Sequence, residues 1–215
     1  MIHINNVKLA TLFVALAVIL GVVVLELINS DKNNKRFLPQ PGSIYTYNYP
    51  STELTIDIQF RSIDSSEAEE ELVGKVEESE SFLQGIATFE SGGEVPFVSA
   101  EGADLTILRL VTNNRNQIEL QKPLNEGKTW TVTSLDAALS SSLTETYEVL
   151  DIIENYRAPF GTLDHVYKIK RSYDHEEIET DYFYIAEEIG LIKWEQNSLE
   201  KRIKYKELIK LEKNS

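Results

Sequence analysis

Residues 54–61 read LTIDIQFR, the clearest alternation of apolar and polar side chains in the chain. The apolar side chains occupy every second position: Leu54, Ile56, Ile58 and Phe60. Successive side chains of a strand point to opposite faces of the sheet, so one face of this segment is apolar and the other is polar. The pattern predicts a half-buried antiparallel strand and makes the domain around it mainly β.

The segments on either side extend this interpretation. Residues 44–49 (IYTYNY) have the β-branched and aromatic composition of a strand. Short apolar runs follow at residues 82–89, 95–98, 105–110 and 118–120. They are punctuated by Gly85, Gly92-Gly93, Gly102 and Asn113-Asn114. Short strands separated by frequent turn residues are typical of an antiparallel meander.

The second half of the chain continues in the same way. Residues 144–156 and 164–173 flank the segment RAPFGTL, whose proline and glycine predict the turn of a hairpin. Three further strands are expected at residues 178–185, 190–194 and 203–211. These segments predict an antiparallel β-sheet for this part of the chain.

A short pattern recurs at the start of each half. Gly42 and Tyr45 match Gly127 and Trp130 in a shared G-x-x-(Y/W)-T sequence, 85 residues apart. The glycine would supply a turn with positive φ, and the aromatic side chain would enter the core as the strand begins. The pattern favours two similar halves, although a match this short also arises by chance.

An acidic stretch interrupts the first half. Residues 64–80 contain eight acidic side chains and one basic one, Lys75. Mutual repulsion and low hydrophobicity favour a solvated loop or an edge hairpin here. A calcium site is the alternative, but the segment lacks the ligand spacing and the central glycine of a calcium loop.

The longest apolar run lies near the N-terminus. Residues 9–25, from Leu9 to Leu25 (LATLFVALAVILGVVVL), contain no charge. A helix of this length spans ~26 Å, close to the ~30 Å hydrocarbon layer of a bilayer. We predict an uncleaved anchor or signal at residues 1–28, with a cleaved signal peptide and a buried core helix as the alternatives.

The flanks of this run give conflicting evidence on orientation. Lys8 precedes it, whereas Lys32, Lys35 and Arg36 follow it, which by the positive-inside rule mildly favours a cytoplasmic domain. The layout of a first helix, a short polar linker and a β-domain is instead that of an exported, tethered protein. We therefore predict a linker at 29–36, a β-domain at 37–215 and an extracytoplasmic location at the cell membrane.

Composition restricts the partners and the chemistry. The chain has 215 residues and a formal net charge of −14, which disfavours nucleic acid and anionic membrane surfaces as main partners. It contains no cysteine, so disulfides, thiolate metal sites, cysteine nucleophiles and a lipidated cysteine anchor are excluded.

Three segments of the second half resemble a known group. They are residues 123–130 (PLNEGKTW), 158–169 (APFGTLDHVYKI) and 182–193 (YFYIAEEIGLIK). They are similar to the PL-x-x-G-x-x-W, VPAGTF-x-x-V-x-K and YYA-x-x-(V/I)-GLVK motifs of uncharacterised bacterial exported proteins and lipoproteins. The resemblance covers mainly residues 123–195 and implies a curved sheet like the lipoprotein-carrier fold. The fold class that we predict is therefore an N-terminal transmembrane helix followed by an antiparallel curved sheet or half-barrel. The chain departs from the group at residues 158–161, which read APFG in place of VPAG, and it lacks the lipidated cysteine.

The sequence contains no clear catalytic, metal-binding or cofactor-binding motif. His165 and His175 are separated in sequence, and the acidic residues are too numerous to single out a catalytic pair. Aromatic residues in strands could contact a ligand, although they more often fill the core: Tyr45, Tyr47, Trp130, Tyr182, Tyr184 and Trp194.

We therefore predict a membrane-anchored binding or structural module rather than an enzyme. An envelope hydrolase with paired carboxylates and a carrier or sensor of an apolar ligand remain as alternatives. Few amphipathic helices are available to cover the apolar face of the sheet, residues 134–143 being the main candidate. Part of that face is accordingly expected to be open to a lipid or to a partner's segment.

Overall fold

The computed structural model describes residues 35–50, 52–76, 81–109, 117–136, 141–174, 180–197 and 202–213. The chain separates into two compact units, Met1–Lys35 and Arg36–Ser215, and every described strand belongs to the second. The predicted anchor at residues 9–25 lies outside the described residues. The helices in the described part of the chain are too short to span a bilayer.

The first half of the domain is a meander of six strands. These are β1 (Ile44–Tyr49), β2 (Leu54–Ile63), β3 (Ser81–Phe89), β4 (Glu94–Glu101), β5 (Leu105–Arg109) and β6 (Gln117–Gln121). Each strand pairs antiparallel with the next.

A second six-stranded meander follows. Its strands are β7 (Thr129–Asp136), β8 (Ser141–Ile153), β11 (Val166–Tyr173), β12 (Thr180–Ala186), β13 (Gly190–Asn197) and β14 (Arg202–Glu212). They also pair antiparallel in sequence order. The basic last strand, β14, then pairs with β1, so the two meanders join into one sheet.

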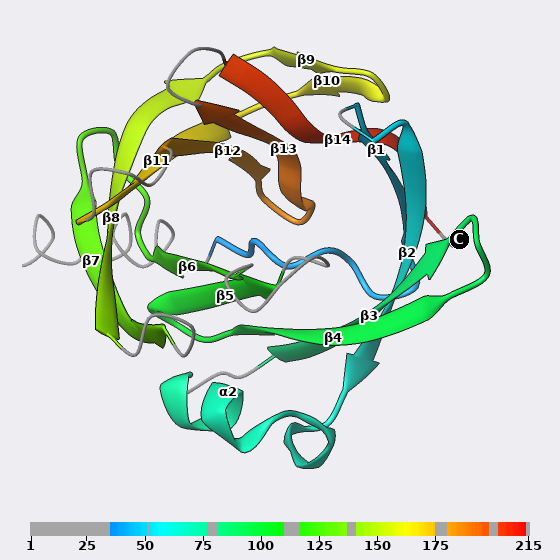
Figure 1. The fold of residues 1–215 in the computed structure, drawn as a ribbon, viewed down its shortest axis with the longest axis horizontal. Helices are drawn as coiled ribbons and strands as arrows, with labels where there is room; N and C mark the ends of the chain where they lie inside the picture. The colour runs from blue at the N-terminus through cyan, green and yellow to red at the C-terminus, as the bar shows by residue number, and fades with distance from the viewer. Residues whose placement is uncertain are drawn as a thin grey trace, which may run out of the picture. The chain divides into compact units, whose positions relative to one another are not determined.

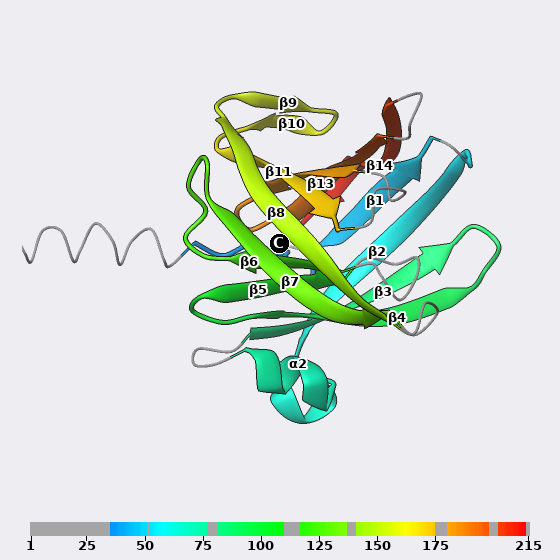
Figure 2. The same ribbon diagram turned by 60° about the vertical axis from the view of Figure 1, so that its left-hand side comes forward.

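The sheet has twelve strands in the order β6-β5-β4-β3-β2-β1-β14-β13-β12-β11-β8-β7. It curls into a nearly closed barrel, with β6 and β7 as its two edge strands (Figures 1 and 2). The prediction of a mainly β, antiparallel, curved sheet is therefore confirmed.

Alternation along each strand directs one set of side chains into the barrel. In β2, Ile56, Ile58 and Phe60 are buried, as predicted, whereas Leu54 at the strand's start is 44% exposed. Aromatic and aliphatic side chains from both meanders fill the interior, among them Tyr45 and Tyr147.

Gly85, which interrupts the predicted apolar run 82–89, lies within β3. It pairs with Phe97 of β4, whose ring covers the position that a Cβ atom would occupy. The predicted apolar run 82–89 is thus a single strand, in which Gly85 makes room for an aromatic ring on the neighbouring strand.

The acidic segment also differs from the prediction. Residues 65–76 contain a 3-10 helix (Ser65–Glu67) and the helix α2 (Glu70–Lys75), not a loop or a hairpin. Leu72 and Val76 are buried against the outer face of the sheet beside Phe82. These two apolar side chains fix the helix against the sheet, and Glu70 at its start is exposed.

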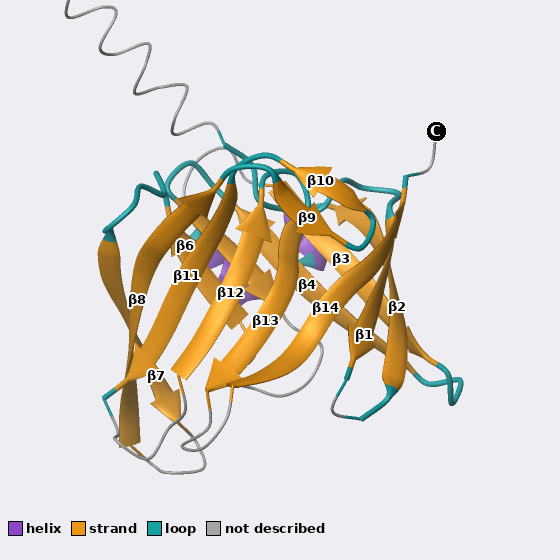
Figure 3. Cartoon of the chain, turned by 90° about the horizontal axis from the view of Figure 1, so that it is seen from above, coloured by secondary structure: helices purple, strands orange, loops and turns teal. Residues whose placement is uncertain are grey.

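A small hairpin covers another part of the outer face. The strands β9 (Tyr156–Ala158) and β10 (Gly161–Leu163) form it between β8 and β11. Figure 3 shows the hairpin at one end of the barrel, near the ends of β13 and β14. Its apolar side chains pack with Val166 of β11, Tyr184 of β12 and Ile192 of β13. The turn predicted from Pro159 and Gly161 is confirmed and forms the tip of this added hairpin.

Residues 134–143 do not supply the covering helix that the sequence favoured. Residues 134–136 end β7 and residues 141–143 begin β8. The neighbouring residues, such as Thr131 and Thr133, are exposed strand residues of β7. Residues 134–136 pair with residues 141–143 in the antiparallel β7–β8 ladder, and this backbone pairing keeps both pieces extended.

The two G-x-x-(Y/W)-T segments have the same local geometry. Gly42 and Gly127 have φ values of 82° and 77°. The Gly42 N–H donates to the Phe60 carbonyl at 2.8 Å, and the Gly127 N–H donates to the Val149 carbonyl at 2.8 Å. Each glycine thus turns the chain into the first strand of a meander and bonds to its second strand.

Candidate functional site

Residues 36–41, which we call the strap, cross the space enclosed by the barrel (blue in Figure 1). The Phe37 N–H donates to Glu101 Oε1 of β4 at 2.7 Å. On the other side, the Glu188 N–H in the β12–β13 turn donates to the Arg36 carbonyl at 2.7 Å. Because β4 and β13 lie far apart in the strand order, the strap connects opposite sides of the barrel.

The centre of the strap is held by close contacts. Phe37 is fully buried, and its ring meets the edge of Tyr167 with centroids 5.4 Å apart. Gly190 has a φ of 79°, and a Cβ atom there would lie 3.0 Å from the Phe37 carbonyl oxygen. A larger residue at 190 would therefore press against the strap.

A half-open pocket of about 190 Å³ lies between the strap and strands β2 and β3. Leu38, Pro39, Pro41, Phe82 and Leu83 supply its apolar lining, and Arg36, Gln40, Ser62, Ser81 and Glu188 supply its polar lining. Two hydrogen bonds tie the polar groups together: Gln40 Nε2 to Glu188 Oε2 at 2.8 Å, and Arg36 Nη2 to Ser81 Oγ at 2.8 Å. The pocket can accept an apolar group while polar side chains remain at its border.

A buried ion pair between Glu101 and Lys122 holds the strap in place. Glu101 and Lys122 are each 4% exposed in their side chains, and Glu101 Oε1 lies 3.4 Å from Lys122 Nζ. Glu101 Oε1 also accepts a hydrogen bond from Thr106 at 2.9 Å. The other oxygen, Oε2, is buried without a hydrogen bond and lies 3.8 Å from Arg36 Nε. The carboxylate thus holds the strap through its oxygen Oε1.

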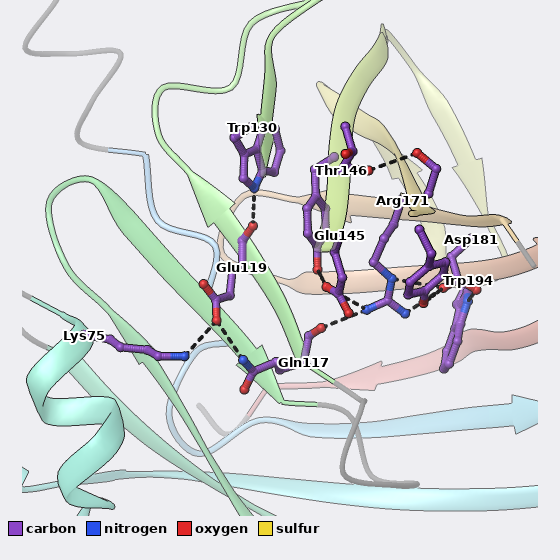
Figure 4. Close-up of polar contacts among 12 residues, drawn as sticks. Lys75, Gln117, Glu119, Trp130, Glu145, Thr146, Arg171, Asp181 and Trp194 are labelled. Atoms are coloured by element: carbon purple, nitrogen blue, oxygen red, sulfur yellow. Dashed lines mark hydrogen bonds and ion pairs between the residues drawn. The ribbon is translucent and has the colours of Figure 1, made fainter. Parts of the chain in front are cut away.

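A second polar cluster lies inside the barrel around Arg171 (Figure 4). Its Nε and Nη2 atoms donate to Asp181 Oδ2 at 3.0 and 2.6 Å, and Nη1 lies 3.7 Å from Glu145 Oε2. Trp194 Nε1 and Tyr173 Oη also donate to Asp181, at 2.9 and 2.7 Å. Burial acts to lower the pKa of Arg171, but the charges of Tyr147, Tyr173, Asp181 and Glu145 outweigh burial and raise the pKa.

This cluster contains the type of carboxylate pair that a hydrolase would need. Glu145 and Asp181 both face Arg171, but Asp181 is fully buried and the guanidinium lies against both carboxylates. The arrangement neutralises the two acids and connects strands, which is a structural role. Among the described residues, no three histidine, aspartate or glutamate side chains are grouped to hold a metal ion.

Side chains cap the free edge of β6. The carbonyl oxygens of Gln117, Glu119 and Gln121 accept hydrogen bonds from Arg171 Nη1 (3.1 Å), Trp130 Nε1 (2.8 Å) and Lys128 Nζ (2.6 Å), respectively. Alternate residues of a strand direct their carbonyls to the same side, here away from β5. We call the junction of β6 and β7 the seam. Neighbouring strands elsewhere in the sheet pair through their backbones, whereas side-chain hydrogen bonds close the seam.

Lys206 of β14 is a buried cation of a different kind. The residue is 3% exposed, and its ammonium lies 4.0 Å from the ring centroid of Tyr47 and 5.5 Å from that of Tyr49. No carboxylate of the described residues lies within salt-bridge distance of it. Burial lowers its pKa to about 7.

The aromatic residues predicted as ligand contacts or core lie on two faces of the sheet. Tyr45, Tyr47, Trp130 and Trp194 belong to the interior core. Tyr184 is buried on the outer face with the β9–β10 hairpin, and the partly buried Tyr182 packs there too. The structure therefore does not bring the six together, and contact with a ligand remains a prediction for each.

The sequence did not reveal the strap, Glu101, Arg171 or Lys206 as related residues. Arg171 and Lys206 both stand at inward positions of strands, next to Ile169 and Leu208 in the alternation. In the sequence, both could have been recognised as charged residues at positions where the alternation of the strand places apolar side chains. Nothing in the sequence around residues 36–41 indicated that they cross the barrel.

Comparisons with known proteins establish the fold. No protein-family model matches the chain, and no curated protein matches it. A solved protein from Bacteroides fragilis, described as exported and as having a YmcC-like fold, has a TM-score of 0.52 at 13% identity. That alignment covers 83% of this chain and 100% of the other. A protein from Parabacteroides distasonis described as a lipoprotein has a TM-score of 0.49 at 15% identity, covering 83% of this chain and 99% of that one. The chain thus has the fold of the Bacteroides fragilis protein.

Proposed function

We propose that the protein is an extracytoplasmic binding module, tethered by residues 9–25, that takes an apolar group into the pocket beneath the strap. The observation that carries this proposal is the pocket itself. Its lining combines Leu38, Phe82 and Leu83 with a border of hydrogen-bonded polar groups. Convergent apolar side chains with a few placed polar groups are the usual composition of a ligand site.

The size of the pocket restricts the ligand. A volume of about 190 Å³ is below the ~300–1,000 Å³ of sites that enclose a drug-sized molecule. The pocket suits the end of an alkyl chain or one bulky apolar side chain. The rest of the ligand would extend past Arg36 and Glu188 at the border.

The position of the strap favours a ligand from the membrane. The strap begins at Arg36, the last residue of the predicted linker at residues 29–36. An extended chain reaches at most ~3.6 Å per residue, so eight residues limit the strap to within ~30 Å of the end of the anchor. In the proposed arrangement, the strap therefore lies near the membrane, and a lipid tail is the apolar group available to it.

Two findings support an extracytoplasmic location. The chain shares its fold with a protein described as exported, and residues 9–25 form an uncharged apolar run long enough for an anchor. Both are consistent with a domain held outside the cell by a single helix.

We also propose that the two meanders are a structural repeat. The equivalent turns at Gly42 and Gly127 begin them, and each contains six strands. In each, the connection between the second and third strands supplies a cover for the outer face: α2 in the first and the β9–β10 hairpin in the second. The seam between β6 and β7 would then correspond to the β14–β1 junction, which is paired through its backbone.

A pocket-filling variant tests the binding function. Ser62 lines the pocket and is exposed, so Ser62→Trp should fill the space without disturbing the core. Gln59→Trp is the matched control, because Gln59 is exposed on the opposite face of the same strand. Purified full-length protein in detergent would be titrated with octan-1-ol and short-chain phospholipid while its thermal midpoint is recorded.

We expect both ligands to raise the midpoint of the wild type and of Gln59→Trp, and to leave that of Ser62→Trp unchanged. Equal responses in all three proteins would show that the ligands bind elsewhere. No response in the wild type would refute apolar ligand binding at the strap.

A further inference from the structure

Lys206 differs from the other buried cations of the barrel. Arg171 lies 2.6 Å from a carboxylate oxygen of Asp181, and Lys122 lies 3.4 Å from one of Glu101. The ammonium of Lys206 instead lies over the rings of Tyr47 and Tyr49. Ring faces attract a cation but replace only part of its hydration.

An ammonium buried without a counter-ion is unfavourable. Removing an ion from water costs several kcal/mol unless a partner or a proton exchange offsets the loss. For Lys206 two forms relieve the cost: the neutral amine, or an ammonium paired with an anion brought in from outside. The described residues supply no such anion.

The surroundings of Lys206 define which anion would fit. Its Cα pairs with that of Trp194 across the β13–β14 ladder, and Leu208, two residues on, is fully buried on the same face. The site therefore offers one positive charge among aromatic and aliphatic side chains. A singly charged group with an apolar tail satisfies this environment, whereas a second charge would have no partner.

We propose that Lys206 is the anchor of a buried anion site that takes the carboxylate of a medium-chain monocarboxylate. The site differs from the strap pocket, because Lys206, Tyr47 and Tyr49 are not among the residues that line that pocket. It goes beyond the proposed function, which requires only an apolar group.

Binding at this site is coupled to protonation. Burial lowers the pKa of Lys206 to about 7, so the site is mostly uncharged at pH 9 and must take up a proton to bind a carboxylate. The facing titratable groups are the phenols of Tyr47 and Tyr49; burial raises the pKa of Tyr47 well above its usual range, so that phenol stays protonated. Glu195 and Glu207 lie near Tyr184 and Tyr156 on the outer face and do not face the site.

The test compares octanoate with octan-1-ol, its uncharged counterpart, by calorimetry on the full chain at pH 6.5 and pH 9. Three variants accompany the wild type. Lys206→Met removes the charge, Lys206→Arg keeps it at both pH values, and Lys210→Met removes an exposed lysine from the same strand. Circular dichroism would confirm that each variant is folded, and Lys206→Arg keeps the test decisive if Lys206→Met is not.

We expect the wild type and Lys210→Met to bind octanoate at pH 6.5 and to lose affinity by about tenfold per pH unit above 7. Lys206→Arg should bind equally at both pH values, and Lys206→Met should not bind octanoate. Octan-1-ol binding at the strap should be the same in all four proteins and at both pH values. Octanoate binding that survives Lys206→Met, or that is absent from the wild type at pH 6.5, would overturn the proposal, whatever the octan-1-ol result.

Discussion

The indole Nε1 of Trp130 donates a hydrogen bond of 2.8 Å to the backbone carbonyl of Glu119. Trp130 lies on the edge strand β7 and Glu119 on the edge strand β6, so this bond crosses the seam of the barrel (Figure 4). The Trp130 ring also stacks on Tyr147 with an interplanar angle of 4°. One side chain therefore fills the core and holds the two free edges together.

Substitution of Trp130 should separate these two roles. Trp130→Ala removes a buried aromatic side chain and should lower the free energy of unfolding by ~3–5 kcal/mol. Trp130→Phe keeps a ring against Tyr147 but leaves the Glu119 carbonyl without its donor, which should cost about 1–3 kcal/mol. Urea denaturation measures both values. Unchanged midpoints would show that the seam does not depend on this residue.

Gly190 should be sensitive to the smallest possible change. Its φ of 79° disfavours any side chain, and a Cβ atom would lie 3.0 Å from the Phe37 carbonyl oxygen. We expect Gly190→Ala to destabilise the domain by about 1–3 kcal/mol and to loosen the strap. Gly93→Ala is the control, since a Cβ there meets no atom within 4 Å. Thermal melting that gives the same shift for both would contradict the strap contact.

The lowered pKa of Lys206 predicts how the free energy of unfolding depends on pH. Its pKa is about 7 in the folded protein and ~10.4 in the unfolded chain. Between these values the unfolded chain binds more protons, so the free energy of unfolding should rise as pH increases from about 7 to 9.5. Tyrosines whose pKa burial raises, including Tyr47 and Tyr147, oppose this trend above pH ~10.

The Lys206→Met variant isolates this contribution. Without the amine, the increase in stability between pH 7 and 9.5 should disappear, and the variant should be more stable than the wild type near pH 7. Urea denaturation across this pH range measures both effects. If the two proteins have parallel pH profiles, the buried lysine does not cause the trend.

The helix α2 should depend on Leu72. Leu72 is 1% exposed and packs against the outer face of the sheet. We expect Leu72→Ala to cost about 2–5 kcal/mol, whereas Leu54→Ala, at a position 44% exposed, should cost less than ~1 kcal/mol. Chemical denaturation followed by circular dichroism compares the two. Similar losses would mean that α2 does not protect the apolar surface beneath it.

Local sequence patterns predicted the strands, because each strand shows its own alternation of apolar and polar residues. The segment with Ile56, Ile58 and Phe60 forms β2 as expected, and the hairpin around Pro159 lies where the turn residues placed it. The errors arose where one distant contact decides the structure. The acidic segment is helical because Leu72 and Val76 have an apolar surface to cover.

The candidate sites were less predictable than the fold. The strap is defined by bonds between Phe37 and Glu101, 64 residues apart, and between Arg36 and the β12–β13 turn. Such contacts follow from closure of the sheet, which the alternation of single strands does not specify. Arg171 and Asp181 stand on neighbouring strands, but their pairing required the register of β11 against β12.

The binding site beneath the strap can be observed directly by nuclear magnetic resonance. Full-length protein with labelled leucine methyl groups would be saturated with octan-1-ol, and intermolecular NOEs would be recorded. The account predicts NOEs from the alkyl chain to Leu38 and Leu83, which line the pocket, and none to Leu120, which is fully buried in the core. NOEs that omit Leu38 and Leu83, or that reach only residues outside the pocket, would contradict the proposed binding function.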